Sequence, residues 1–246
     1  MRAQLQTQKK PNSLSIDELV ENFRGIRVWN HISRFDWVLY SQNLYAENLI
    51  LIGGHRGKSV SHLLQKIPGL ARLHVYEPIQ EYADEIAENI LDPRVLVYRE
   101  AIFNGEDLTM SVGGDGSLID ATKRTLPPRI TLEYKMSVKS VKLSDAVERI
   151  RLENQNSHFT YTVFMNCEGS EYEILSAIGS LNNQPKSIFI QNHTATKKPF
   201  VNLFKLRMQL SEFYYPLVST NWAWDIWVRN DYISKTISEL EQDPVR

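Results

Sequence analysis

The chain has 246 residues and a formal net charge of −1, with 42% hydrophobic and 23% charged residues. This balance argues against a nucleic-acid partner and against an anionic membrane surface, because both favour a basic surplus. The single cysteine excludes an intrachain disulfide framework and a cysteine-rich zinc module, which favours a cytoplasmic protein. No stretch approaches the roughly 18 consecutive apolar residues of a membrane span, so we expect neither a signal peptide nor a membrane anchor. Nothing in the sequence indicates an oligomeric state.

Residues 1–47 are predicted to form a helical segment that packs on the rest of the chain. Ser15 and Glu18 fit a capping box, which predicts a short helix to about Phe23. An aromatic-rich stretch follows from residue 28 to residue 45, with the spacing of a buried helical face.

Residues 48–246 are predicted to form one domain of alternating strands and helices. Runs typical of buried strands lie at residues 49–52, 73–76, 95–98, 161–165, 186–190, near 217 and at 224–228. Amphipathic segments predict helices at residues 58–66, 79–90, 144–150, 170–178 and 201–213. This alternation favours an α/β fold with right-handed βαβ units and a doubly wound, parallel sheet.

One region interrupts the alternation. Turn dipeptides and Pro127-Pro128 make residues 104–128 an irregular insertion or a hairpin. Residues 136–143 then read as extended chain with a slip in its alternation.

The first predicted strand runs into a glycine-rich turn, GGHRGKS at residues 53–59. Such a turn leaves backbone N–H groups and the positive end of a helix dipole available to an anion. A phosphate-binding loop and a dinucleotide-binding turn would each need a glycine at Ile52, which disfavours ATP and NAD. The looser turn used for S-adenosylmethionine remains, with Gly53, His55 and Gly57. A plain strand–helix turn is the alternative.

Glu77 lies 20 residues after Gly57, at the carboxyl end of the second predicted strand. An acid at this place can accept hydrogen bonds from both ribose hydroxyls of a nucleoside cofactor. NAD sites share this feature, and a solvated acid at a strand end is the alternative interpretation.

Two segments resemble the FkbM-type methyltransferases. Tyr76-Glu77-Pro78, followed by Tyr82 and Asn89, is similar to the family's acidic-Pro signature, and the segment 166–171, NCEGSE, resembles its Asp-x-Glu-Gly-x-Glu motif. The resemblance covers about residues 48–228. It implies a Rossmann-like class I methyltransferase fold with a seven-stranded sheet and a final antiparallel strand, and S-adenosylmethionine-dependent O-methyl transfer. The cofactor-binding residues expected on this basis are Gly53, Gly54, His55, Gly57, Glu77, Pro78, Ala101 and Asn166.

The chain departs from the family pattern at several positions. Leu51, Asn166 and Gln191 stand where the family has acids, and His55 stands where it has an asparagine. Hard cations need charged oxygen ligands, so we expect no metal. Arg56 is expected either to pair with the cofactor's carboxylate or to point to solvent.

His193 and Glu168 are the candidates for the catalytic base that removes the acceptor's proton. His193 follows the fifth strand of the predicted domain, and its ordinary pKa suits proton removal near neutrality. A locally bonded loop histidine is its alternative, and Glu168 is alternatively an anchor for Gly169 and the following helix.

The sequence therefore predicts an O-methyltransferase that uses S-adenosylmethionine and acts on a hydroxyl of a small molecule or glycan. Because three acids are replaced, a catalytically inactive, methyltransferase-like binding or scaffolding protein is the alternative. The acceptor is not encoded in any readable motif.

Overall fold

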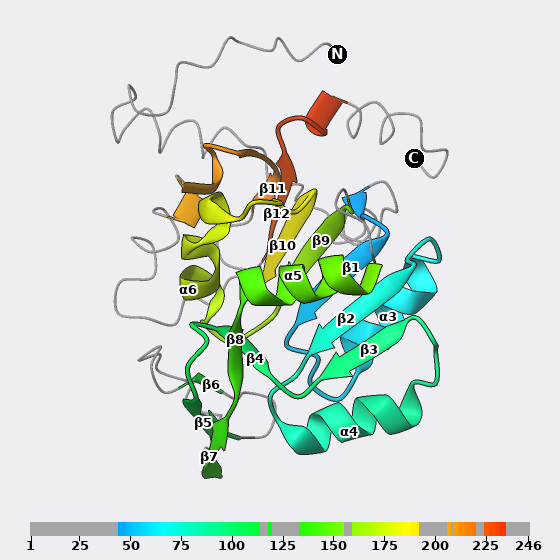
Figure 1. Ribbon diagram of the computed structural model, residues 1–246, viewed down its shortest axis with the longest axis vertical. Helices are drawn as coiled ribbons and strands as arrows, with labels where there is room; N and C mark the ends of the chain where they lie inside the picture. Colours follow the sequence, from blue (N-terminus) through cyan, green and yellow to red (C-terminus); the bar gives the residue numbers. More distant parts are fainter. Residues whose placement is uncertain are drawn as a thin grey trace.

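The computed structural model describes residues 44–113, 118–119, 133–154, 159–191, 206–207, 209–219 and 224–234 (Figure 1). The predicted N-terminal helices lie outside these residues, as do residues 192–200 and residues 201–205 and 208 of the predicted helix at 201–213.

A seven-stranded sheet with the order β11-β12-β10-β9-β1-β2-β3 forms the centre of the molecule. Its strands are β1 (Asn48–Ile52), β2 (Arg72–Tyr76), β3 (Val95–Tyr98), β9 (Tyr161–Met165), β10 (Ser187–Gln191), β11 (Tyr214–Ser219) and β12 (Trp224–Arg229). Strands β3, β2, β1, β9 and β10 pair in parallel, whereas β12 runs antiparallel to β10 and β11. The expected Rossmann-like, methyltransferase-type sheet with a final antiparallel strand is confirmed.

The alternation of side chains along β1 explains why helices cover both faces of this sheet. Leu49 and Leu51 pack in one core cluster with residues of α3 (Lys58–Lys66) and α4 (Gln80–Asn89). Ile50 and Ile52 pack in the other cluster with residues of α5 (Leu143–Asn154) and α6 (Glu171–Ser176). All five residues of β1 are buried, as expected for a parallel strand between two helical layers. Helix α5 crosses the sheet face that is turned to the viewer in Figure 1.

Two small sheets include most of the described part of the segment that was expected to be an irregular insertion or a hairpin. β4 (Ala101–Phe103) pairs in parallel with β8 (Ser140–Lys142), and β5 (Leu108–Val112) lies between β6 (Leu118–Ile119) and β7 (Tyr134–Val138). The three-stranded sheet lies below the large one in Figure 1. The predicted slip corresponds to the single residue between β7 and β8, and the described residues of the turn-rich segment 104–128 include β5 and β6.

The remaining boundaries differ by a few residues. The helix expected at 170–178 is the shorter α6, followed by a 3-10 turn, η4 (Ile178–Ser180). Tightening of this kind is common at the ends of helices.

The order of the parallel strands determines where a ligand can reach this fold. The chain leaves β1 toward β2 and β3, then returns to place β9 on the other side of β1. Ligands of open α/β sheets bind beyond the carboxyl ends of the strands, where the strand order reverses in this way. The glycine turn and the segment 166–171 follow directly from β1 and β9.

Candidate functional site

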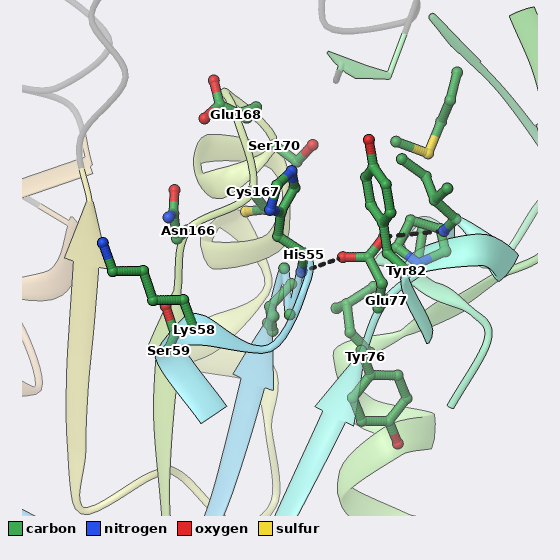
Figure 2. Close-up of a pocket in the computed structure, with 18 residues that line it drawn as sticks. His55, Lys58, Ser59, Tyr76, Glu77, Tyr82, Asn166, Cys167, Glu168 and Ser170 are labelled. Atoms are coloured by element: carbon green, nitrogen blue, oxygen red, sulfur yellow. Dashed lines mark hydrogen bonds between the residues drawn. The ribbon is translucent and has the colours of Figure 1, made fainter. Parts of the chain in front are cut away.

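A cavity of about 280 Å³ lies at the carboxyl ends of β1, β2 and β9 (Figure 2). Most of the residues expected from the sequence line it: Gly53, Gly54, His55, Glu77, Pro78, Ala101, Asn166 and the base candidate Glu168. Gly57 does not line it. His193 falls outside the described residues, so its place in the site stays a prediction.

Two glycines of the turn are required by close packing. A Cβ on Gly53, whose φ is 88°, would lie 2.0 Å from the carbonyl oxygen of Asn166. A Cβ on Gly57, whose φ is 85°, would meet Ile90 and Ile86 at 3.0 and 3.3 Å. Gly53 therefore lets the ends of β1 and β9 approach, whereas Gly57 lets α3 begin against α4.

The turn uses its backbone N–H groups within the protein. Gly53 donates to the Tyr76 carbonyl at 3.0 Å, Gly57 donates to the Gly54 carbonyl at 3.0 Å, and His55 donates to Glu77 Oε2 at 2.7 Å. The expectation that the turn leaves these groups free for an anion is therefore wrong for these three residues. Buried backbone donors need partners, and the end of β2 supplies two of them.

Glu77 is a buried carboxylate that joins the turn to α4. Its side chain is 4% exposed, and its two oxygens accept the backbone N–H groups of His55 and Ile79 at 2.7 and 2.9 Å, as dashed lines show in Figure 2. Burial raises the pKa of Glu77 to about 7, while the N–H groups of Ile79, His55 and Gly54 act to lower it. The alternative of a solvated strand-end acid is wrong. The carboxylate still borders the cavity, where it can accept hydrogen bonds from a ligand.

Two cavity residues have strained backbones. Among the described residues, the non-glycine positions with positive φ are His55, at 46°, and Glu168, at 53°. Both line the cavity, just beyond the neighbouring strands β1 and β9. The ring of His55 packs 4.6 Å from that of Tyr82. Strain of this kind collects at functional sites, because it persists only where the surroundings enforce it.

Asn166 and Ser170 line the cavity, and each has a buried side-chain oxygen. Ser170 is 1% exposed, and neither its Oγ nor the buried Oδ1 of Asn166 has a hydrogen-bond partner among the described residues. The backbone N–H of Asn166 is bonded to the Ile52 carbonyl at 2.9 Å, which holds this residue at the end of β1. Unpartnered buried oxygens are costly, and a donor on a bound ligand would satisfy both.

Two residues considered from the sequence, Arg56 and Leu51, do not line the cavity. Arg56 pairs with Glu85 at 2.5 Å and with Glu81 at 3.4 Å, and its guanidinium lies 4.5 Å from the centre of the Tyr82 ring. It therefore does not take the role of a carboxylate partner for a cofactor in this arrangement. Leu51 is fully buried on the α3 face of the sheet, so a residue at that position does not line the cavity.

Cys167 lines the cavity but is partly buried against the core. Burial raises the pKa of its thiol well above the ordinary value, so the group stays protonated. A protonated, partly buried thiol of this kind behaves as a small apolar residue rather than as a nucleophile.

Sequence reasoning missed several other lining residues, namely Lys58, Ser59, Ile79, Ile102, Met110 and Ser170. Lys58, Ser59 and Ser170 lie within the quoted motifs, so their positions were a usable signal. Met110 comes from β5 of the insertion, where no motif marks a residue that lines the cavity.

Within the described part of the chain, no group of three or more His, Cys, Asp or Glu side chains could hold a metal ion. The helices of that same part include none that is long and apolar enough to cross a membrane.

No protein-family model matches the sequence, and no curated protein matches it. Several solved structures are similar to this chain. The chain is similar to an O-methyltransferase from Bacillus cereus in complex with SAH, with 13% identity, a TM-score of 0.43, and coverage of 92% of this chain and 94% of the other. It is also similar to the O-methyltransferase TomG from Streptomyces achromogenes in complex with SAM, with 11% identity, a TM-score of 0.43 and 92% coverage of both chains.

A third similar structure is the methyltransferase FkbM from Methylobacillus flagellatus KT, with 12% identity and a TM-score of 0.42. The match covers 74% of this chain and 43% of that one, so this chain spans less than half the length of the FkbM structure. The fold assignment itself rests on the strand order and strand directions described above.

Proposed function

We propose that the protein binds S-adenosylmethionine in this cavity and transfers its methyl group to a hydroxyl of a small molecule or glycan, as a divergent relative of the FkbM-type methyltransferases. The observation that carries the proposal is Glu77, a buried carboxylate at the end of β2 that borders a cavity beside the glycine turn. An acid at this position suits the two hydroxyls of a ribose.

The lining residues fit the three parts of this cofactor. Ile79, Ala101 and Met110 would supply an apolar surface for the adenine, from the N-cap of α4, from β4 and from β5. Glu77 would hold the ribose. Asn166 and Ser170 would meet the amino-acid part with the oxygens that have no partner among the described residues. When bound, the cofactor supplies a methyl group activated by its sulfonium.

This chain's own residues would contribute mainly by position. Transfer from a sulfonium is an in-line displacement, in which orienting the two reactants supplies much of the rate. The acceptor hydroxyl must also lose a proton, and a side-chain base within hydrogen-bond reach provides for this. Glu168 is the candidate base that borders the cavity, and His193 remains a second candidate.

A methyltransferase-like protein without turnover is the second candidate function. Asn166, at the end of β9, and Gln191, the last residue of β10, carry neutral amides that cannot accept a proton at the edge where the acceptor would bind. A protein of this kind would bind the cofactor without consuming it when offered a panel of acceptors.

Calorimetric titration with S-adenosylhomocysteine at pH 8, where Glu77 is ionised, tests the proposed function. We expect one ligand per chain for the wild type and at least tenfold weaker binding for Glu77→Gln. Glutamine keeps one acceptor oxygen, for the N–H group of either His55 or Ile79, and presents its NH2 group to the other, whereas alanine would leave both N–H groups without an acceptor.

Glu81→Gln is the matched control, because Glu81 is an exposed acid on α4, the helix that follows Glu77, and does not line the cavity. The affinity of Glu81→Gln for S-adenosylhomocysteine should equal that of the wild type. Absence of heat at high micromolar ligand, with folded wild-type protein, would overturn the proposal.

A further inference from the structure

We infer that the protein forms a symmetric dimer in which the β3 strands of two copies pair antiparallel, so that the two large sheets join into one. The inference goes beyond the proposed function and does not depend on it. It assigns a partner, a second copy of this chain, to a sheet edge that no sequence motif marked.

The two edges of the central sheet are built differently. At one edge, β11 contains Pro216, and its register with β12 shifts between Pro216 and Val218. A proline and a bulge are devices that keep an edge strand from pairing with another chain. At the other edge, β3 contains no proline, and all of its residues pair with β2 in one continuous register (Figure 1). Only the β11 edge carries these protecting devices.

The backbone of β3 has hydrogen-bonding groups on its outer side. The carbonyls of Arg94 and Tyr98 accept the N–H groups of Leu73 and Glu77 at 2.8 and 3.0 Å, so Arg94 and Tyr98 turn their backbone toward β2. Alternate residues of a strand bond to opposite sides, so Val97 turns its N–H and C=O outward. Within the described residues, β3 pairs with β2 alone. A second β3 strand would supply partners for the outward groups.

An antiparallel pair with its twofold axis at Val97 is self-complementary. The Val97 residues of the two copies lie directly opposite each other, where each N–H can donate to the other C=O. Arg94 of one copy then lies opposite Glu100 of the other, on both sides of the axis. Opposite charges in directly opposed positions stabilise a strand pair. Because Arg94 pairs with Asp92 and Glu100 pairs with Arg149 within each chain, the contact would extend two existing ion pairs.

A groove beside β3 has room for a side chain of the partner. Its volume is about 440 Å³, and its lining includes Val97 and two small residues of α4, Ala83 and Ala87. Val97 packs on the α3 and α4 side of the sheet, so the same residue of a second copy would lie on that side too, over the groove. The charge of Arg99, which also lines the groove, is balanced by an ion pair with Asp84.

Sedimentation equilibrium of the full chain, over a hundredfold range of protein concentration, tests this dimer. The mass of the wild type should rise with concentration toward twice the chain mass of 28.5 kDa. Val97→Pro removes the outward N–H, and an edge strand tolerates proline where the N–H faces away from the sheet. This variant should stay at the mass of one chain, with circular dichroism and urea unfolding as checks that it is folded.

A charge reversal gives a second test, which decides the matter if Val97→Pro does not fold. Glu100→Lys places a like charge opposite Arg94 of the other copy, so the dissociation constant of the dimer should rise at least tenfold. Glu148→Lys is the matched control, because Glu148 is also an acid paired with an arginine of α5, Arg151, but lies outside the segment 94–100. The dissociation constant of Glu148→Lys should stay within twofold of the wild-type value.

A wild-type mass of one chain over the whole concentration range would overturn the inference. A dimer that folded Val97→Pro retains would also overturn it, as would equal dissociation constants for Glu100→Lys and Glu148→Lys, because the copies would then meet through another surface. A mass that rises beyond two chains would contradict a twofold pairing, which closes after two copies. Each of these outcomes leaves the proposed function standing.

Discussion

The two ends of the central sheet both carry buried polar side chains, but they use them differently. At the amino ends of β9 and β10, Thr162 and Ser187 are fully buried and bond to each other at 2.9 Å. Thr162 also accepts the backbone N–H of Ala46 at 2.9 Å, and Ser187 donates to the Leu44 carbonyl. At the carboxyl end, Asn166 and Ser170 have buried oxygens without partners among the described residues.

This difference separates polar groups that hold the fold together from polar groups that have no partner among the described residues and belong to residues lining the cavity. The hydroxyls of Thr162 and Ser187 tie the segment before β1 to the sheet. Glu77 combines the two roles, since it braces the glycine turn and also borders the cavity. Variants at each end should therefore change different properties.

The largest effect is expected at the carboxyl end, from Gly53→Ala. The new Cβ would lie 2.0 Å from a backbone oxygen, at a φ of 88°, so we expect a loss of at least about 4 kcal/mol or failure to fold. Gly105→Ala is the matched control, because its φ is 87° but the Cβ meets only the flexible Lys142 side chain, at 3.3 Å. It should cost about 1 kcal/mol in urea unfolding. Equal losses in the two variants would contradict the close approach of β1 and β9.

The pH dependence of stability should reveal the buried carboxylate. The folded-state pKa of Glu77, about 7, lies above its ordinary value of 4.5, so its contribution to stability is complete below pH 4.5 and is lost as the pH rises through 7. At 1.36 kcal/mol for each pKa unit, the loss is about 3 kcal/mol. Urea unfolding from pH 4 to pH 8 should show this loss in the wild type relative to Glu77→Gln.

His74 acts in the opposite direction in nearly the same range. Burial, and then the charge of Arg72, lower its pKa from 6.5 to about 4, so its contribution to stability grows as the pH rises from 4 to 6.5. A plot of the free energy of unfolding against pH should therefore be flatter for the wild type than for Glu77→Gln. In the variant, the gain from His74 is no longer offset by the loss from Glu77. Parallel profiles for the two proteins would contradict the raised pKa of Glu77.

The smallest effects on the free energy of unfolding are expected from removing single hydroxyls. These effects should differ between the two ends of the central sheet. Thr162→Val leaves the Ala46 N–H without an acceptor, which should lower the free energy of unfolding by about 1 to 3 kcal/mol. Ser170→Ala removes a hydroxyl that has no partner among the described residues, so its effect on unfolding should stay within about 0.5 kcal/mol. A larger loss for Ser170→Ala than for Thr162→Val would reverse the comparison.

The central sheet was predictable because its signal is local. The strands β1, β2 and β9 are short apolar runs, and after its first residue β2 is as completely buried as the other two. The small strands were not predictable, because β4 has only three residues and β5 carries Thr109 and Ser111 between its apolar residues. The pairing of β4 with β8, and of β5 with β7, depends on partners 22 to 39 residues away along the chain.

The sequence predicts which residues lie at the candidate site better than it predicts how those residues are bonded and packed. The positions of Gly53, Glu77 and Asn166 follow from the ends of predicted strands. The bonds from the His55 and Ile79 N–H groups to Glu77 depend on the left-handed backbone of the turn, which no residue type specifies at His55. The contact of Met110 with the cavity depends on how the insertion packs.

Native mass spectrometry of the wild-type protein with added S-adenosylmethionine tests the central claim most directly. The account predicts a complex with one cofactor per chain, present in Thr162→Val and reduced in Ser170→Ala, because only the second residue lines the cavity. Folded wild-type protein that keeps its bare mass at saturating S-adenosylmethionine would contradict the claim.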